Sequence, residues 1–250
     1  MVRVCFDPAG THPLCDLSEY QEIVGVLLFI TSYVRVDCVY AVHVLTRFMQ
    51  APARLHLLLA RRMLAYLYGT RAIGLTYRRG GDLSVSASFV PAGAPPQGMH
   101  AASDSDWAVG PSTSDFVIMM AGAAVGWTAR LQRCSTLSSA ESEFYALSEA
   151  VAEVVHFHNM LSDAGMPPQQ PTLIFCDRRG ARLMAMDVAS SQRTRHIHRR
   201  WYFVTFHVDE GEVEIKELRG SRNFSDCLSK CTGGKTFTGE RSYIMGMNVE

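Results

Sequence analysis

The sequence lacks an excess of charge of one sign, an apolar run long enough to span a membrane, and a compact cysteine framework. Its 24 basic and 24 acidic side chains cancel, so any basic patch that binds nucleic acid or a membrane must be found by position. The longest apolar stretches, 23–30 and 116–129, are shorter than the roughly 18 residues of a transmembrane helix. The seven cysteines are scattered along a 250-residue chain, which is too long to need disulfides, so we expect reduced thiols.

Charged residues are also scarce, at 19%, while hydrophobic residues make up 48%. A typical chain carries about 25% charged residues, so this composition favours a folded protein with a real core over a disordered one. The first residues, Met1-Val-Arg-Val-Cys, lack the apolar core of a signal peptide. We therefore expect an intracellular protein, cytoplasmic or nuclear, that is not secreted and has no membrane partner.

The first hundred residues predict a small helical segment followed by a β-hairpin. A capping box at Ser18 and Gln21 precedes a helix over about 18–32, and apolar periodicity predicts two more helices, over 39–48 and 55–67. Alternating runs at 73–77 and 83–89 flank Arg78-Arg-Gly-Gly-Asp, which is typical of a hairpin. The proline- and glycine-rich stretch 91–98 then marks a domain boundary. The predicted parts are 1–92, 97–232 and a C-terminal tail, 233–250.

The second part has the pattern of an α/β domain with a mixed sheet. Short apolar runs predict five strands, near 99–104, 116–120, 124–131, 172–176 and 212–218. A capping box at Ser138 and Glu141 opens a helix that continues to Leu161, and a short helix is expected at 181–187. Strands interleaved with helices in this order favour a sheet flanked by helices.

Four acidic residues lie at positions where an α/β domain can form a ligand-binding or metal-binding site. Glu143 falls within the apolar stripe of its helix, where a carboxylate must be paired, protonated or bound to a metal, unless the helix start leaves it partly solvated. Asp177 follows a buried strand, and ligand sites of α/β sheets gather at strand ends, although an Asp there can also cap the next helix. Asp104 and Asp226 are each compatible with a cation ligand or with a polar surface position.

The combination is more informative than any of these acids alone. Carboxylates from several strand ends and helix starts can converge on divalent ions, and their hard oxygens suit Mg²⁺ or Mn²⁺. In two-metal hydrolysis such ions lie about 4 Å apart, and they activate a water and stabilise the leaving oxygen of a phosphodiester.

Six sequence blocks, in a fixed order, resemble the ribonuclease H domain of Copia-type LTR retrotransposon Pol polyproteins. The blocks are Ser103-Asp-Ser-Asp-Trp-Ala, Ser112-Thr-Ser-Asp-Phe-Val, Leu137-Ser-Ser-Ala-Glu-Ser-Glu-Phe-Tyr-Ala-Leu-Ser-Glu-Ala, Phe175-Cys-Asp-Arg-Arg-Gly-Ala, Arg193-Thr-Arg-His-Ile and Ser225-Asp-Cys-Leu-Ser-Lys. Upstream, Tyr20-Gln-Glu-Ile-Val-Gly-Val-Leu and Arg35-Val-Asp-Cys-Val-Tyr-Ala-Val resemble the segment that connects the reverse transcriptase to the ribonuclease H. The resemblance covers about residues 16–232.

The resemblance implies a ribonuclease H-like fold, a mixed five-stranded sheet flanked by helices, behind a reverse transcriptase connection fragment. It places the family's four catalytic, metal-binding acids at Asp104, Glu143, Asp177 and Asp226. It implies that they hold two Mg²⁺ or Mn²⁺ ions and cleave the RNA strand of an RNA–DNA hybrid. The missing reverse transcriptase portion is a further partner that it implies. Because no Tyr-x-Asp-Asp motif occurs in the chain, we expect no polymerase activity.

Three departures from the family pattern leave a second hypothesis open. Arg178-Arg179 replaces Asn-Gln after the second Asp, His196-Ile-His198 replaces His-Ile-Asp, and Ser229-Lys230-Cys231 replaces Thr-Lys-Pro after the last acid. Two cations beside a proposed ligand can lower metal affinity. The alternative is therefore a degenerate, non-catalytic domain that binds nucleic acid.

Positive charge is concentrated between 178 and 207, where seven arginines accompany one aspartate. Such a segment, followed by Trp201-Tyr-Phe, suits phosphates and stacked bases, although a solvated helix face with its aromatics in the core fits equally well. The predicted nucleic-acid-binding residues are Arg178, Arg179, Arg193, Arg195, His196, Arg199 and Arg200.

Overall fold

The computed structural model describes residues 16–79, 91–95, 98–106, 112–132, 136, 138–177, 195–218 and 223–247. The chain divides into two compact units, Met1–Ile73 and Gly74–Glu250. This division falls earlier in the chain than the stretch 91–98, where composition places a boundary. No described helix is long and apolar enough to cross a membrane.

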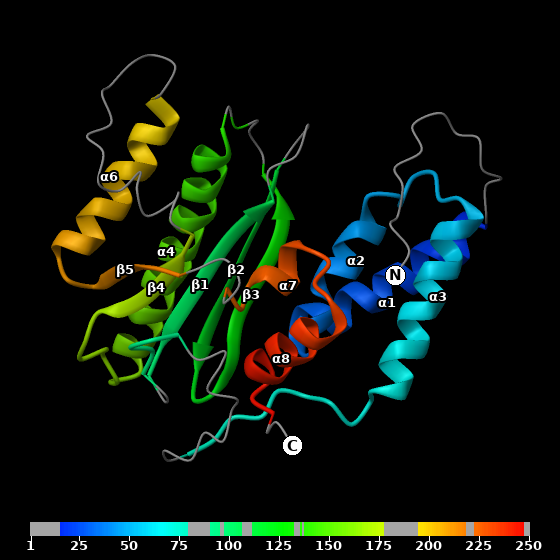
Figure 1. The fold of residues 1–250 in the computed structure, drawn as a ribbon, viewed down its shortest axis with the longest axis horizontal. Coiled ribbons are helices and arrows are strands. Elements are labelled where there is room, and N and C mark those ends of the chain that lie inside the picture. The colour runs from blue at the N-terminus through cyan, green and yellow to red at the C-terminus, as the bar shows by residue number, and fades with distance from the viewer. Residues whose placement is uncertain are drawn as a thin grey trace. The chain divides into compact units, whose positions relative to one another are not determined.

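In its described residues the N-terminal unit is helical, as its apolar periodicity predicts. It contains α1 (Leu17–Tyr33), the short 3-10 helix η1 (Val36–Cys38), α2 (Val39–Thr46) and α3 (Arg54–Gly69). Figure 1 shows these helices, and their apolar side chains form the core of the unit. The predicted capping box at Ser18 is wrong. Asp16 caps α1 instead, because its carboxylate accepts the backbone N–H groups of Ser18 and Glu19 and is favoured by the helix dipole.

A buried ion pair lies in this unit. The guanidinium of Arg35 donates to both carboxylate oxygens of Asp37, each at 2.8 Å, and the two side chains are 5% and 0% exposed. The Tyr66 hydroxyl donates to Asp37 at 2.8 Å, and Arg35 also donates to Thr70. Both charges are therefore compensated where they are buried.

The C-terminal unit is built on a mixed five-stranded sheet, which confirms the predicted fold class. Its strands are β1 (His100–Asp106), β2 (Thr113–Met120), β3 (Ala123–Leu131), β4 (Thr172–Cys176) and β5 (Val213–Glu217). The order across the sheet is β3-β2-β1-β4-β5. β1, β2 and β3 pair antiparallel, whereas β4 pairs parallel to both β1 and β5. The carboxyl ends of β1 and β4 therefore lie at the same edge of the sheet.

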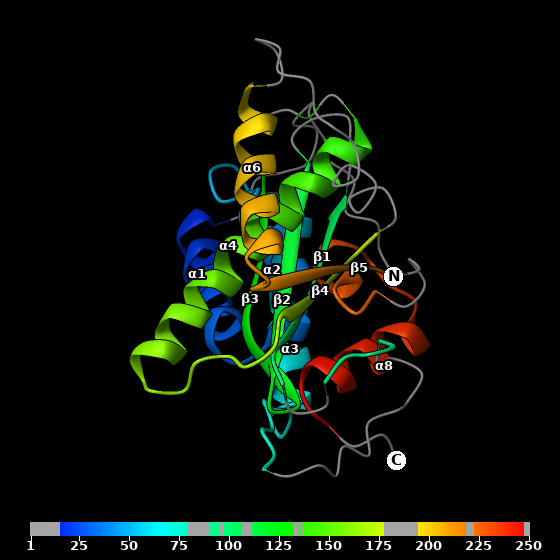
Figure 2. The same cartoon turned by 90° about the vertical axis from the view of Figure 1, so that its left-hand side faces the viewer.

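Helices cover both faces of this sheet (Figure 2). α4 (Ser139–Asp163) packs on β1, β2 and β4, and α6 (Arg195–Asp209) packs on α4 and β5. On the other face, α7 (Asp226–Ser229) contacts β1, β2 and β3, and α8 (Gly234–Ile244) contacts β3. Ser138 caps α4 by accepting the N–H of Glu141 at 3.2 Å, as the sequence predicts. The core between sheet and α4 includes Ile118, Phe144, Leu147 and Ile174.

Three local predictions have other outcomes. Residues 73–77, expected as the first hairpin strand, form no strand; instead the N–H of Thr76 donates to Met245 and that of Arg78 to Ala121. The second hairpin strand and the helix expected at 181–187 lie outside the described residues. Helix α8 occupies most of the segment expected as a tail.

Candidate metal centre

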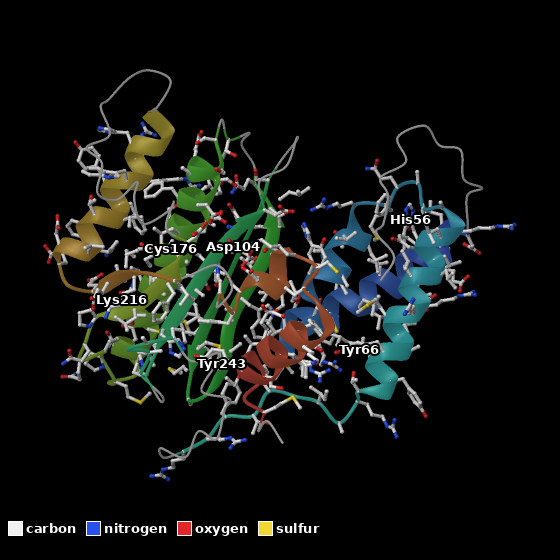
Figure 3. All side chains as sticks on the ribbon, in the orientation of Figure 1. His56, Tyr66, Asp104, Cys176, Lys216 and Tyr243 are labelled. Atoms are coloured by element: carbon white, nitrogen blue, oxygen red, sulfur yellow. The ribbon has the colours of Figure 1, made fainter. Side chains whose placement is uncertain are left out.

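Asp104 lies on β1 beside α7 (Figure 3). Its strand is sandwiched between β2 and β4, and the residue is only 3% exposed. The sequence predicts a strand that ends at Asp104, but β1 continues to Asp106, and Asp104 pairs with Asp115 of β2. A carboxylate in this position has little contact with water and depends on neighbouring groups for compensation.

Helix α7 supplies the partners of Asp104. The Ser229 hydroxyl donates to Oδ2 of Asp104 at 3.1 Å, and the ammonium of Lys230 lies 2.6 Å from the same oxygen. Lys230 also lies 3.4 Å from Oδ1 of Asp226, in the first turn of α7. The short helix thus brings one acid, one hydroxyl and one cation to the middle strand of the sheet.

Asp226 is the second predicted acid at this place. Burial, and next the charge of Asp104, raise its pKa to about 7, although the Lys230 ammonium opposes the shift. Its side chain is 18% exposed. The residue is therefore not a plain surface aspartate, the other possibility that the sequence left open.

Glu143 reaches the same cluster from the opposite face of the sheet. It lies in the second turn of α4 and is 7% exposed, which excludes a solvated position at the helix start. Burial raises its pKa to about 8, with further contributions from the charges of Asp104 and Asp177. Glu143 thus lies close enough to two other acids for their charges to raise its pKa further.

Asp177 directly follows β4, as predicted, and is partly exposed. Because β4 pairs parallel with β1, its carboxyl end lies beside that of β1, and the charge of Asp177 acts on Glu143. The structure therefore brings all four predicted acids into one electrostatically connected cluster, made of β1, α4, β4 and α7.

A fifth acid, Asp115, belongs to the same cluster, although the sequence pattern does not predict it as a site residue. It pairs directly across from Asp104 in the antiparallel ladder and is 0% exposed. Neither of its carboxylate oxygens has a hydrogen-bond partner among the described residues; the hydroxyls of Ser225 and Ser229, which oppose the rise in its pKa, donate to Asn223 and Asp104. Burial, followed by the charge of Asp104, raises its pKa well above the usual range.

The acid cluster, defined as Asp104, Asp115, Glu143, Asp177 and Asp226, suits a hard divalent cation by its donor chemistry. Its ligands are all carboxylate oxygens, and the unpartnered oxygens of buried Asp115 need a cation or a proton. Among the described side chains, however, no three His, Cys, Asp or Glu residues already converge in a geometry that could hold a metal. The carboxylate donors therefore suit a divalent cation. In this structure, however, Asp104 and Asp226 form ion pairs with Lys230 instead.

The predicted basic surface is described only in part. Arg178, Arg179 and Arg193 lie outside the described residues, and so do the side chains of Arg195 and His196 in α6. Arg199 is exposed on α6 and available to a partner. Arg200 instead packs on α4: it donates to the Ser148 hydroxyl at 2.6 Å, and its guanidinium lies 3.7 Å from the ring centroid of Tyr145.

The aromatic residues of α6 are divided between core and surface. Trp201 packs against the core beneath α4, whereas Tyr202 and Phe206 are 57% and 58% exposed. The expectation of core aromatics therefore holds for Trp201, whereas binding of phosphates and bases by this segment stays a prediction. The exposed rings lie on the same helix as Arg199.

No family model matches the chain. A retrovirus-related Pol polyprotein from transposon RE1 of Arabidopsis thaliana is 28% identical over 226 residues, which are 89% of this chain and 14% of that protein. A putative transposon Ty5-1 protein of Saccharomyces cerevisiae is 37% identical over 150 residues, which are 60% of this chain and 45% of that protein. The chain therefore spans less than half the length of either relative.

Among solved structures, the crystal structure of LC11-RNase H1 in complex with an RNA/DNA hybrid matches 50% of this chain and 88% of that chain. The TM-score is 0.39 and the sequence identity 10%. A likeness this distant assigns no function.

Proposed function

Because the chain belongs to the family of retrovirus-related Pol polyproteins from Copia-type transposons, we propose that its C-terminal unit is a metal-dependent ribonuclease. Its substrate is an RNA–DNA hybrid, of which it hydrolyses the RNA strand. The observation that carries the proposal is the acid cluster, in which Asp104 and Glu143 are both buried and the charge of Asp104 helps to raise the pKa of Glu143. Such strongly perturbed, partly uncompensated acids favour a site over a purely structural role.

The assignment of roles follows from position in the fold. Asp104, Glu143, Asp177 and Asp226 would hold the metal ions, since the other three acids are connected to Asp104 directly or through Glu143. When two Mg²⁺ or Mn²⁺ ions are bound, they supply an activated water and stabilise the leaving oxygen of the phosphodiester. Asp104 is the shared member of the cluster because it interacts with acids on both faces of the sheet.

Three of the four carboxylates lie on, or directly after, well-packed elements. β1 is paired on both sides, α4 is packed on the sheet, and Asp177 follows the buried strand β4. A site supported in this way loses little entropy when its ligands are ordered. The chain's own contribution to the reaction is therefore the fixed placement of negative charge at one edge of the sheet.

Recognition of the hybrid is proposed for the basic segment 178–207. Within the described part, Arg199 and the exposed rings of Tyr202 and Phe206 are suited to phosphates and bases. We expect slight sequence preference because hybrids are recognised mainly through backbone and groove shape. The absent reverse transcriptase portion of the polyprotein is proposed as a second partner.

A second candidate function, binding without catalysis, is favoured by one observation. The ammonium of Lys230 lies between Asp104 and Asp226, and the described acids do not converge as a ready metal site. A domain fixed in this arrangement keeps the fold and the basic helix but cleaves nothing.

The deciding experiment incubates the purified full chain with an end-labelled RNA–DNA hybrid, with and without Mg²⁺ or Mn²⁺. Cleavage of the RNA strand only in the presence of metal is expected. It should fall at least a hundredfold in Asp104→Asn and Glu143→Gln, because removing a charge that stabilises the transition state costs about that much.

The matched control is Asp163→Asn, which changes an exposed acid at the end of α4 and should cleave like the parent chain. Binding of the hybrid is measured in parallel by fluorescence anisotropy. Binding without metal-dependent cleavage in the parent chain would reject the nuclease and leave the binding domain.

A further inference from the structure

The position of Lys230 leads to an inference that rests on the proposed metal-dependent function and goes beyond it. Its ammonium is 2.6 Å from Oδ2 of Asp104 and 3.4 Å from Oδ1 of Asp226. Asp104 is almost fully buried, with its side chain 4% exposed, whereas the side chain of Lys230 is 42% exposed. The lysine side chain therefore extends from the solvent to the buried carboxylate of Asp104.

Charge balance explains why a cation is found there. In the described part of the chain, Lys230 is the only basic side chain that forms an ion pair with Asp104 or Asp226. Its charge also opposes the shift that Asp104 and Asp177 produce at Glu143. Without this ammonium, Asp104 and Asp226 would face each other with Ser229 as the remaining donor to Asp104.

A metal ion held by Asp104 and Asp226 together would compete with this ammonium for the same oxygens. Carboxylate oxygens lie about 2.0–2.1 Å from Mg²⁺, so the same Oδ2 atom cannot bind the ion and keep an ammonium at 2.6 Å without strong repulsion between the two cations. Occupation by the lysine and occupation by the metal therefore exclude each other.

Departure of the lysine requires little rearrangement. Its side chain is a flexible four-carbon stem carrying a strongly hydrated charge, and it is already nearly half exposed. It follows α7 as the C-cap residue, and its backbone N–H donates to the carbonyl of Asp226 at 2.8 Å. The backbone can thus stay in place while the side chain turns to water.

We propose that Lys230 is a built-in counter-cation of the acid cluster, which neutralises Asp104 and Asp226 in the metal-free chain and is displaced when a divalent ion binds. The lysine stabilises the metal-free fold and lowers the apparent affinity for metal. Loading of the site is an exchange of one monovalent side-chain cation for a divalent ion.

The test compares the full-length parent chain with Lys230→Met, which keeps the aliphatic stem and removes the charge. The matched control is Lys235→Met, at an exposed position of α8. Mn²⁺ binding is measured by isothermal titration calorimetry, and stability by urea unfolding in EDTA and in excess Mn²⁺. These readouts do not depend on cleavage of a substrate.

Lys230→Met should bind Mn²⁺ about tenfold more tightly than the parent, at the lower end of the effects that groups beside a metal's ligands exert. It should also be less stable in EDTA and recover more stability on addition of Mn²⁺, while Lys235→Met matches the parent throughout. Lys230→Gln provides a second uncharged variant in case the methionine prevents folding.

The outcomes separate the two proposals. Equal or weaker Mn²⁺ binding by both uncharged variants overturns displacement and leaves the nuclease untouched. If the parent binds metal and cleaves no hybrid while Lys230→Met still binds more tightly, the counter-cation stands and the nuclease fails. No Mn²⁺ binding by any chain overturns both.

Discussion

The two units of the chain bury charge in opposite ways. In the N-terminal unit, Arg35 and Asp37 form a bidentate pair at 2.8 Å, and neighbouring hydroxyls complete the hydrogen bonding. In the C-terminal unit, Asp104 and Asp226 share Lys230 as their described basic partner, and Asp115 has no hydrogen-bond partner among the described residues.

The Arg35–Asp37 pair is an arrangement that serves the fold, whereas the acid cluster is one that folding alone does not favour. A buried pair with matched charges and satisfied donors is close to neutral for stability and is strongly destabilised when one partner is removed. An excess of buried acids destabilises the fold as it stands and is relieved when one of them is removed. Removal of a single acid should therefore have opposite effects in the two units.

Asp37→Ala tests the first half of the comparison and should have the largest effect. The substitution leaves the guanidinium of Arg35 buried without its anion, in a side chain that is 5% exposed. We expect a loss of about 3–5 kcal/mol in the free energy of unfolding. Urea unfolding followed by circular dichroism of the full chain measures it. A loss below about 1 kcal/mol would mean that the pair is solvated in solution, and the contrast between the units would fail.

Asp115→Asn tests the second half and should change stability in the other direction. The carboxyl is fully buried and its pKa is raised well above the usual range, so the folded chain must hold a proton there or bury a charge at neutral pH. The amide keeps the size and removes that cost, and we expect a gain of about 1–2 kcal/mol at pH 7 in EDTA.

The pH dependence of this gain provides a check on its cause. A carboxyl whose pKa is raised in the folded state contributes most stability below its unfolded pKa, about 4, and loses that contribution as the pH rises. The difference between Asp115→Asn and the parent should therefore be small near pH 4 and grow towards pH 8. A difference that is constant over this range would attribute the effect to packing.

The sequence predicts the elements of both units well because their patterning is strong. The apolar stripe of α4 gives its position and identifies Glu143 as a buried acid, and the run Thr172–Cys176 coincides with β4. Strand ends are less well predicted, and for this reason the sequence pattern did not identify Asp115 as a member of the acid cluster. The strand was expected to begin at 116, just after Asp115, whereas β2 begins at Thr113 and sets Asp115 opposite Asp104.

The contacts of Lys230 could not be predicted from local pattern at all. The ion pair with Asp104 joins residues 126 positions apart, and it depends on α7 packing against β1. The sequence does contain a partial signal, since Lys230 follows the predicted acid Asp226 by four residues, a spacing that joins charges on a helix. Its reach to a second acid is a property of the tertiary fold.

Glu19→Gln should have the smallest effect on stability, because it removes an acid that is paired but exposed. Glu19 pairs with Arg61 in the N-terminal unit, and the Arg61 and Glu19 side chains are 59% and 37% exposed. Water and salt screen such a pair, so the free energy of unfolding should change by less than about 0.5 kcal/mol, and still less in 1 M salt. The same urea assay that is used for Asp37→Ala measures it. A loss approaching that of Asp37→Ala would show that pairing itself, rather than burial, governs how the chain responds to losing an acid, and the contrast between the ion pair and the acid cluster would then lose its physical basis.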